Sequence, residues 1–133
     1  MEVEIDENKA MSIQSVQVIS IPVSDQNRSK EFYCQALGFH VENDQPMGPT
    51  MRWLQLALSN ATFTISLVTW FDEMPPGSMK GLMLQVDNVD TVAKDLASRG
   101  YLDDPTVHEE PWGRYVTIND PDNNSLILME PPH

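Results

Sequence analysis

Hydrophobic and polar positions along the chain follow two periods, and each change of period marks an expected element. Residues 15–23 alternate with a period of two, as in a strand rich in β-branched residues. Residues 26–36 instead carry apolar side chains at helical spacing, after an N-cap signal at Ser24-Asp25 and before a helix stop at Gly38. The same pattern predicts a second helix and five further strands: a helix over 89–99, and strands over 51–58, 62–69, 81–86, 114–119 and 125–130.

The second half of the chain repeats the first at a spacing of 62 residues. Gly38 matches Gly100 after the two helices, and Arg52-Trp53 matches Arg114-Tyr115. Such a repeat indicates two equivalent units, neither of which can bury its sheet face alone. We therefore predict one α+β domain whose two short, curved sheets enclose a cleft. Its expected boundaries are a flexible acidic tail over 1–13, a domain over 14–131, and modules over about 14–71 and 80–131.

Short motifs at the ends of these elements occur in both halves of the chain. They are Val23-Ser-Asp25, Ser29-Lys-Glu-Phe-Tyr33, Leu37-Gly-Phe39, Val86-Asp-Asn88, Arg99-Gly100, Pro111-Trp-Gly113 and Asp120-Pro-Asp-Asn123. Together they resemble the vicinal-oxygen-chelate superfamily, also called the glyoxalase/bleomycin-resistance/extradiol-dioxygenase superfamily. The resemblance implies two βαβββ modules in a curved mixed sheet around a cleft, usually a homodimer, and a cavity for a small organic molecule. The superfamily includes glyoxalase I lyases, extradiol dioxygenases, fosfomycin-modifying enzymes, epimerases and proteins that bind bleomycin-like antibiotics.

Catalytic members of this superfamily hold one divalent metal ion with ligands on the first and last strands of each module. Here the resemblance puts Val18, Ile65, Gly81 and Ile127 at the ligand positions, and none of them has a donor side chain. Gln17, Ser66 and Lys80 are their neighbours, but a slip of one residue turns a strand side chain to the opposite face of the sheet. We expect no cofactor, and a Zn, Ni, Mn or Fe ion only if this register is wrong.

The composition and the net charge limit the classes of partner that the protein is expected to bind. With 20 acidic and 8 basic residues, the net charge is −12. Such a surface repels phosphate backbones and anionic lipids, so neither nucleic acid nor a membrane is an expected partner. No apolar run approaches the roughly 20 residues that span a bilayer. The single cysteine, Cys34, excludes an internal disulfide and suits a reducing cytoplasm, where we expect the protein to act.

Seven side chains are candidates for contact with a ligand in the cleft. Aromatic rings and an arginine near a cleft mouth stack on and anchor planar or anionic molecules, although dimer or core packing explains them equally well. Other candidates should share a face with the vacant metal positions. Tyr115 and Met51 belong to the same aromatic and apolar group. The seven are Ser20, Trp53, Met83, Gln85, Trp112, Arg114 and Met129.

His108 and Glu110 are weaker candidates for catalysis. An imidazole beside carboxylates is suited to general-base chemistry, whereas the alternative is an exposed acidic loop. The leading hypothesis is a metal-independent protein that binds an apolar or aromatic small molecule. The alternatives are a metal-dependent glyoxalase I-like lyase, an isomerase or an extradiol dioxygenase, and a partner module without a ligand.

Overall fold

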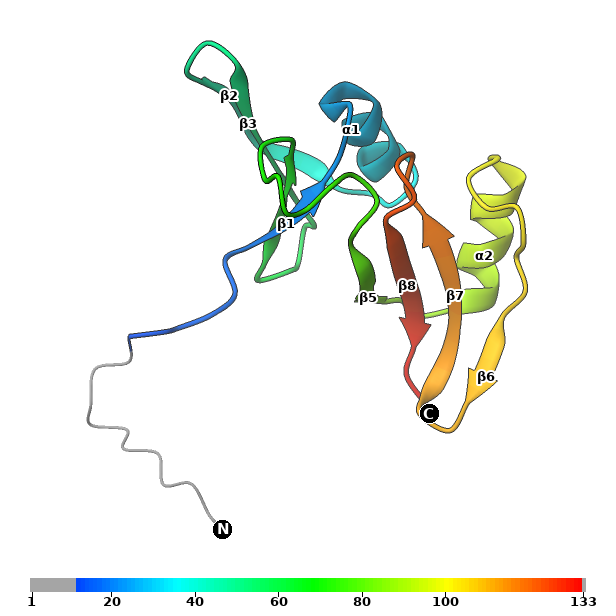
Figure 1. Ribbon diagram of the computed structural model, residues 1–133. Helices are drawn as coiled ribbons and strands as arrows, with labels where there is room; N and C mark the ends of the chain where they lie inside the picture. Colours follow the sequence, from blue (N-terminus) through cyan, green and yellow to red (C-terminus); the bar gives the residue numbers. More distant parts are fainter. Residues whose placement is uncertain (1–11, 133) are drawn as a thin grey trace.

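The computed structural model describes residues 12–132, which form two βαβββ modules (Figure 1). The tail expected over 1–13 therefore lies almost entirely outside the described residues. The first module contains β1 (Val18–Pro22), α1 (Gln26–Gln35), β2 (His40–Met47), β3 (Met51–Ala57) and β4 (Thr64–Val68). The second contains β5 (Lys80–Gln85), α2 (Val89–Ser98), β6 (His108–Glu110), β7 (Gly113–Asn119) and β8 (Ser125–Glu130).

Each module forms its own four-stranded mixed sheet. The strand orders are β1-β4-β3-β2 and β5-β8-β7-β6, which are the same arrangement in the two halves. The first strand of each module runs parallel to the last, and the other pairs are antiparallel. The predicted α+β fold of two equivalent modules with curved sheets is confirmed.

The hydrophobic pattern of the sequence does not predict two of the strands, β2 and β6. β2 is exposed along most of its length, so it shows no alternation of buried and exposed side chains; it forms because it pairs with β3 from His40–Ala57 to Met47–Met51. The segment His108–Glu110, expected either to take part in catalysis or to form an exposed acidic loop, is the exposed edge strand β6 and pairs with β7. Both strands depend on backbone pairing with a partner rather than on burial of their own side chains.

The two helices begin in the same way. Asp25 caps α1 by accepting a hydrogen bond from the backbone N–H of Arg28, and Asn88 caps α2 through the N–H of Thr91. These bonds satisfy backbone donors that have no partner inside the helix. The glycine signals at the helix ends are also explained, because Gly38 and Gly100 have φ angles of +78° and +81°.

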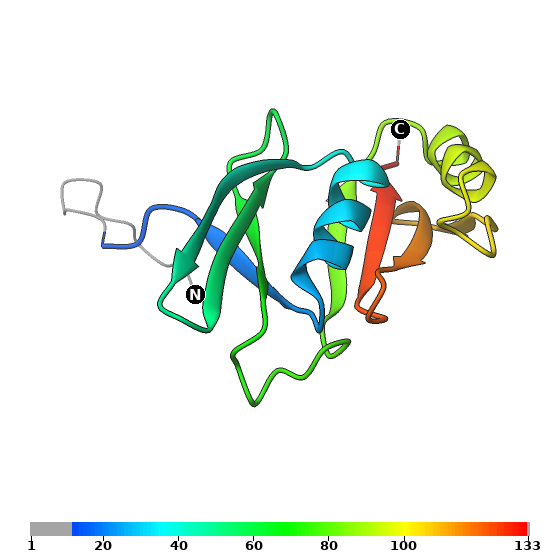
Figure 2. The same ribbon diagram turned by 90° about the horizontal axis from the view of Figure 1, so that it is seen from above.

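One hydrophobic core joins the two modules. Seen from above, α1 lies between the first-module strands and β8, while α2 lies beyond the second-module sheet (Figure 2). Side chains of both sheets and both helices therefore belong to one buried cluster. The sheet residues of this core include Ile21, Leu54, Leu56, Ile65, Leu67, Leu84, Val116, Ile118, Leu126 and Leu128.

No helix among residues 12–132 is long and apolar enough to cross a bilayer.

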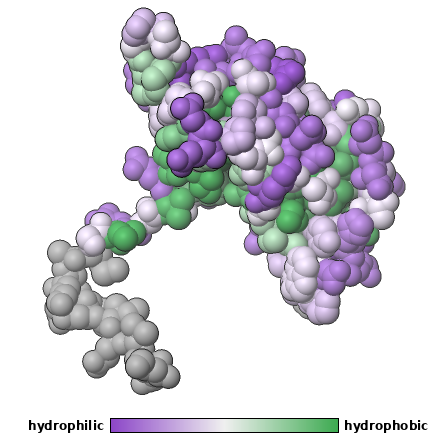
Figure 3. All heavy atoms as spheres, viewed as in Figure 1, coloured by the Kyte–Doolittle hydropathy of each residue, from purple (hydrophilic) through white to green (hydrophobic). Residues whose placement is uncertain are grey.

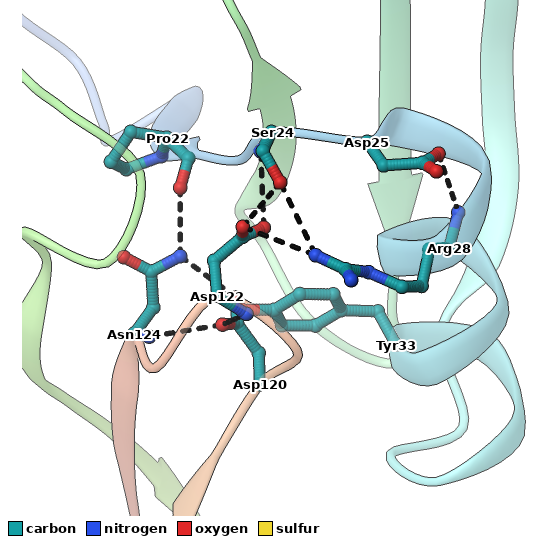
Figure 4. A network of polar contacts seen from close by, with 8 residues as sticks. All are labelled: Pro22, Ser24, Asp25, Arg28, Tyr33, Asp120, Asp122 and Asn124. Atoms are coloured by element: carbon teal, nitrogen blue, oxygen red, sulfur yellow. Dashed lines mark hydrogen bonds and ion pairs between the residues drawn. The ribbon is translucent and has the colours of Figure 1, made fainter.

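A turn over residues 120–124 attaches the second module to the first (Figure 4). The buried carboxylate of Asp120 accepts hydrogen bonds from the Tyr33 hydroxyl at 2.8 Å and from the backbone and side-chain nitrogens of Asn124 at 2.9 and 2.8 Å. The Asn124 amide also donates to the carbonyl of Pro22 at 2.8 Å. Asp122 accepts from the hydroxyl and N–H of Ser24. Burial, reinforced by the Asp120 charge, raises the pKa of Tyr33, so its hydroxyl stays a donor.

Tyr33→Phe is expected to lower the free energy of unfolding by about 2 kcal/mol, because the buried Asp120 carboxylate loses one donor. Urea unfolding of both proteins measures the difference. Tyr101→Phe is the matched control, since the Tyr101 hydroxyl makes no hydrogen bond to any residue in 12–132. Equal losses in the two variants would contradict a stabilising role for the Tyr33–Asp120 bond.

Candidate functional site

The register of the second sheet defines a face that points away from the core. Met83 is the partner of Ile127, which in turn is the partner of Thr117. The residues between them along the strands, such as Leu84 and Val116, belong to the core, so these partners point the other way. We call this side of the sheet the second open face. Its residues are Met83, Gln85, His108, Tyr115, Thr117, Ile127 and Met129.

An aromatic stack stands on the second open face. His108 lies opposite Tyr115 in the β6–β7 pair, and their ring centroids are 5.2 Å apart at an interplanar angle of 28°. Trp112, in the turn between β6 and β7, stacks on Tyr115 at 5.4 Å and 13°. The Trp112 side chain is 53% exposed and Met83 is 49% exposed. The second open face thus carries stacked rings on β6 and β7 and an exposed thioether on β5.

Gly113 makes room for this arrangement. It has a φ of +147°, and a Cβ at this position would lie 2.5 Å from the Sδ of Met129 and 2.8 Å from the carbonyl oxygen of Glu130. Met129 faces Tyr115 across the β7–β8 pair and is almost fully buried. The Pro-Trp-Gly segment therefore packs directly on β8, and only glycine fits at its last position.

The first module has a matching open face. Ser20 pairs with Ser66, which pairs with Gln55, and Trp53 lies two residues before Gln55 on the same side of β3. The Trp53 indole donates to Gln55 at 3.0 Å, and the Gln55 amide donates to Thr64 at 2.8 Å. Trp53 also lies 6.3 Å from the ring of Trp70, and Trp70 6.0 Å from Phe71. Trp53 and Tyr115 thus occupy equivalent aromatic positions.

The register also corrects one of the four metal-ligand positions. Gln55 pairs with Ser66 and the equivalent Thr117 pairs with Ile127, so Ser66 rather than Ile65 is the counterpart of Ile127. The spacing of 62 residues fails here because the path from β7 to β8 is one residue shorter than that from β3 to β4. Ile65 points into the core instead.

The corrected set does not fit a divalent metal ion. Val18, Gly81 and Ile127 have no donor, and Gly81 sits at a register shift in β5 with a φ of +82°. Ser66 contributes one hydroxyl, which is buried without a hydrogen-bond partner. Metal ions of this class require three or four donors at about 2.0–2.3 Å. Throughout residues 12–132, no group of three or more His, Cys, Asp or Glu side chains could hold a metal ion.

Arg114 lies apart from the other candidates. It pairs with Asp90 of α2 through bonds of 2.7 and 3.1 Å and with Glu109 at 3.0 Å. The Arg114 guanidinium lowers the pKa of Asp90 through these hydrogen bonds. In the first module, Arg52 likewise lowers the pKa of Asp44 through its hydrogen bonds to that carboxylate. It also donates a hydrogen bond to a side chain of α1, that of Asn27. Each arginine therefore ties a strand to its own helix, on the side opposite the open face.

The structure thus distributes the sequence candidates over three places, one of which is the position of Arg114 against α2. Met83, Gln85, Met129 and His108 share the second open face, with Trp112 stacked at its rim; Glu110 follows on the same side of β6. Ser20 and Trp53 lie on the first open face. Sequence reasoning did not include Trp70, Phe71 or Gln55, and only the equivalence of Trp53 and Tyr115 signalled the importance of this region.

Comparison with known proteins agrees with this geometry. The sequence profile of the glyoxalase/bleomycin resistance protein/dioxygenase superfamily matches residues 15–128. The chain belongs to this superfamily. The crystal structure of TnmS3, an antibiotic-binding protein from Streptomyces sp. CB03234, is similar to it, with a TM-score of 0.83 and 43% identity over 92% of this chain and 100% of that one.

Two further relatives, one of them described as a member of the superfamily, cover nearly the same region. A structure from Sphaerobacter thermophilus DSM 20745 has a TM-score of 0.80 and 30% identity, over 90% of this chain and 99% of that one. The protein YetH of Bacillus subtilis (strain 168) is 29% identical over 89% of this chain and 99% of its own length. The likeness therefore extends over both modules.

Gly113→Ala is expected to destabilise the protein by about 2–4 kcal/mol, because the added methyl group overlaps Met129 and the backbone of Glu130. Gly48→Ala is the control: its φ is +76°, but a Cβ there has no neighbour within 4 Å, so it should lose only about 1 kcal/mol. Denaturant unfolding measures both. Equal losses would mean that packing against Met129 is not the constraint.

Proposed function

We propose that this protein binds a planar aromatic or apolar small molecule on the second open face without using a metal ion. The observation that supports this most directly is the aromatic stack of His108, Tyr115 and Trp112, which lies on the same face of the sheet as exposed Met83. His108 and Trp112, the outer rings of the stack, are both exposed. A flat ligand placed against Trp112 would extend the same stack.

The chemistry of the face suits such a ligand. An aromatic pair contributes about 0.5–1.5 kcal/mol beyond the area that it buries, and thioethers adapt to irregular apolar shapes. Gln85 supplies one amide, which donates and accepts hydrogen bonds. A few polar groups in a mostly apolar surface are typical of sites for small molecules. The description of TnmS3 as antibiotic-binding supports the same class of ligand.

The proposal includes a homodimer in the cytoplasm as the acting form. The two open faces belong to separate sheets, and a monomer leaves Met83 of the second face and Trp112 at its rim about half exposed to water. From the side shown in Figure 3, hydrophobic residues are visible beside β1 and over the second-module strands, bordered by polar ones. Exposed apolar patches of this kind mark interaction surfaces.

Binding is tested with a panel of planar aromatic metabolites and antibiotics. A ligand that binds the native state raises the melting temperature, and the increase grows with the logarithm of ligand concentration above Kd. Trp112→Ala and Tyr115→Ala should each weaken binding at least tenfold, as titration of tryptophan fluorescence or calorimetry would measure. Phe71→Ala is the control, because Phe71 is an exposed ring (47%) of the first module and outside the stack.

The same titrations test whether ligand binding requires a metal ion. Affinity should be unchanged by EDTA or by added Zn²⁺, Ni²⁺, Mn²⁺ or Fe²⁺. A panel that produces no stabilisation, or a ligand whose affinity depends on added metal and not on Trp112, would contradict the proposal.

Sedimentation equilibrium should give about twice the mass of the 15.0 kDa chain at micromolar concentration. Burial of the apolar side chains of the open faces is the physical reason. A monomer at concentrations that saturate the ligand would remove the dimer from the proposal and leave the stack as a site of one chain.

A further inference from the structure

We propose a second binding site, an apolar groove between the two modules, which takes a neutral or cationic lipophilic small molecule and excludes anions. Its outer cavity shares Met83 and Gln85 with the second open face, but neither cavity includes the three stacked rings, so the groove does not depend on ligand binding at the stack. Two cavities form the groove. They meet at Leu58, Leu84 and Gln85, which line both.

The inner cavity lies between the helices and has a volume of about 470 Å³. Its walls come from the end of α1 (Ala36, Leu37), from β5, and from α2 (Val92, Leu96). The outer cavity, about 730 Å³, lies between β5 and the turn that joins β3 to β4. Sites for small organic molecules are about 300–1,000 Å³, so the inner cavity alone is large enough.

The two modules whose segments line the groove are attached to each other at two places. The 120–124 turn makes one attachment through Tyr33. In the other, Arg99 donates to the carbonyl of Gln35 at 2.7 Å and to Asp95 at 2.7 Å, which bridges the end of α1 to α2. Strand β5 is an edge strand, and no first-module strand pairs with it.

The same edge gives the groove polar groups. In a strand paired on one side only, the backbone N–H and C=O groups of the other side have no strand partner. Gln85, the one amide side chain that lines both cavities, is exposed. A lipophilic ligand with one hydrogen-bonding group fits this combination of apolar walls and an amide.

Charge decides between ligand classes. Asp87 lines the outer cavity and Asp95 the inner one, and among the described residues no Lys, Arg or His lines either. Asp95 forms an ion pair with Arg99, but the chain as a whole still carries a net charge of −12. An anion that enters an apolar groove loses hydration and gains no positive partner.

Two fluorescent probes with the same ring system test the site. N-phenyl-1-naphthylamine is neutral, and 1-anilinonaphthalene-8-sulfonate adds one negative charge. The neutral probe should bind saturably, and the sulfonate at least tenfold more weakly. Equal affinity, or no saturable binding of the neutral probe, would overturn the proposal.

Substitutions locate the probe. Val92→Trp fills the inner cavity, and Ala61→Trp narrows the outer one at an exposed position that leaves the core intact. At least one should weaken the neutral probe tenfold, while Trp112→Ala should have no effect. Loss of binding in Trp112→Ala alone would place the probe on the aromatic stack and overturn the groove.

Asp87→Lys tests the charge argument. It should raise the affinity of the sulfonate probe severalfold and leave the neutral probe unchanged. Asp103→Lys, an exposed change of the same charge away from the groove, is the control. An equal gain in both variants would show that net charge, and not the groove, governs sulfonate binding.

Discussion

The buried Asp120 carboxylate is the interaction on which the arrangement of the two modules depends. It orders its own turn by accepting from the backbone of Asn124, and it receives the Tyr33 hydroxyl from α1 of the other module. A buried carboxylate is stable only when such donors surround it. With Arg99 as a second bridge, this contact fixes α1 between the sheets and leaves the groove beside β5.

The repeated module supplies equivalent positions that the chain uses for different purposes. Arg52 and Arg114 each tie a strand to the helix of its module, so this pair kept one structural role. Trp53 and Tyr115 also correspond, but Trp53 bonds Gln55 whereas Tyr115 stands between His108 and Trp112. The positions that hold a metal in catalytic relatives contain apolar or hydroxyl side chains. The superfamily scaffold is therefore retained, while Val18, Gly81 and Ile127 offer no donor side chain at these positions.

Much of the fold could be predicted because its signals are local. The caps at Asp25 and Asn88 and the glycines after both helices act through hydrogen bonds and φ angles within a few residues. The exposed strands β2 and β6 could not be predicted in this way, since their side chains show no buried face and only their partners define them. The Ile65 assignment failed for a related reason: a constant spacing cannot reveal that one turn is a residue shorter.

The sequence by itself determined the repeat, the fold class, the helix boundaries and the absence of donor side chains at Val18, Gly81 and Ile127, because residue type and spacing suffice for each. Only the tertiary structure decided which candidates meet. It joined His108, Tyr115 and Trp112 into a stack, turned Arg114 toward α2, and formed a groove from segments of both modules. The physical reason is that strand pairing and burial set side-chain directions, and both depend on residues far apart in the chain.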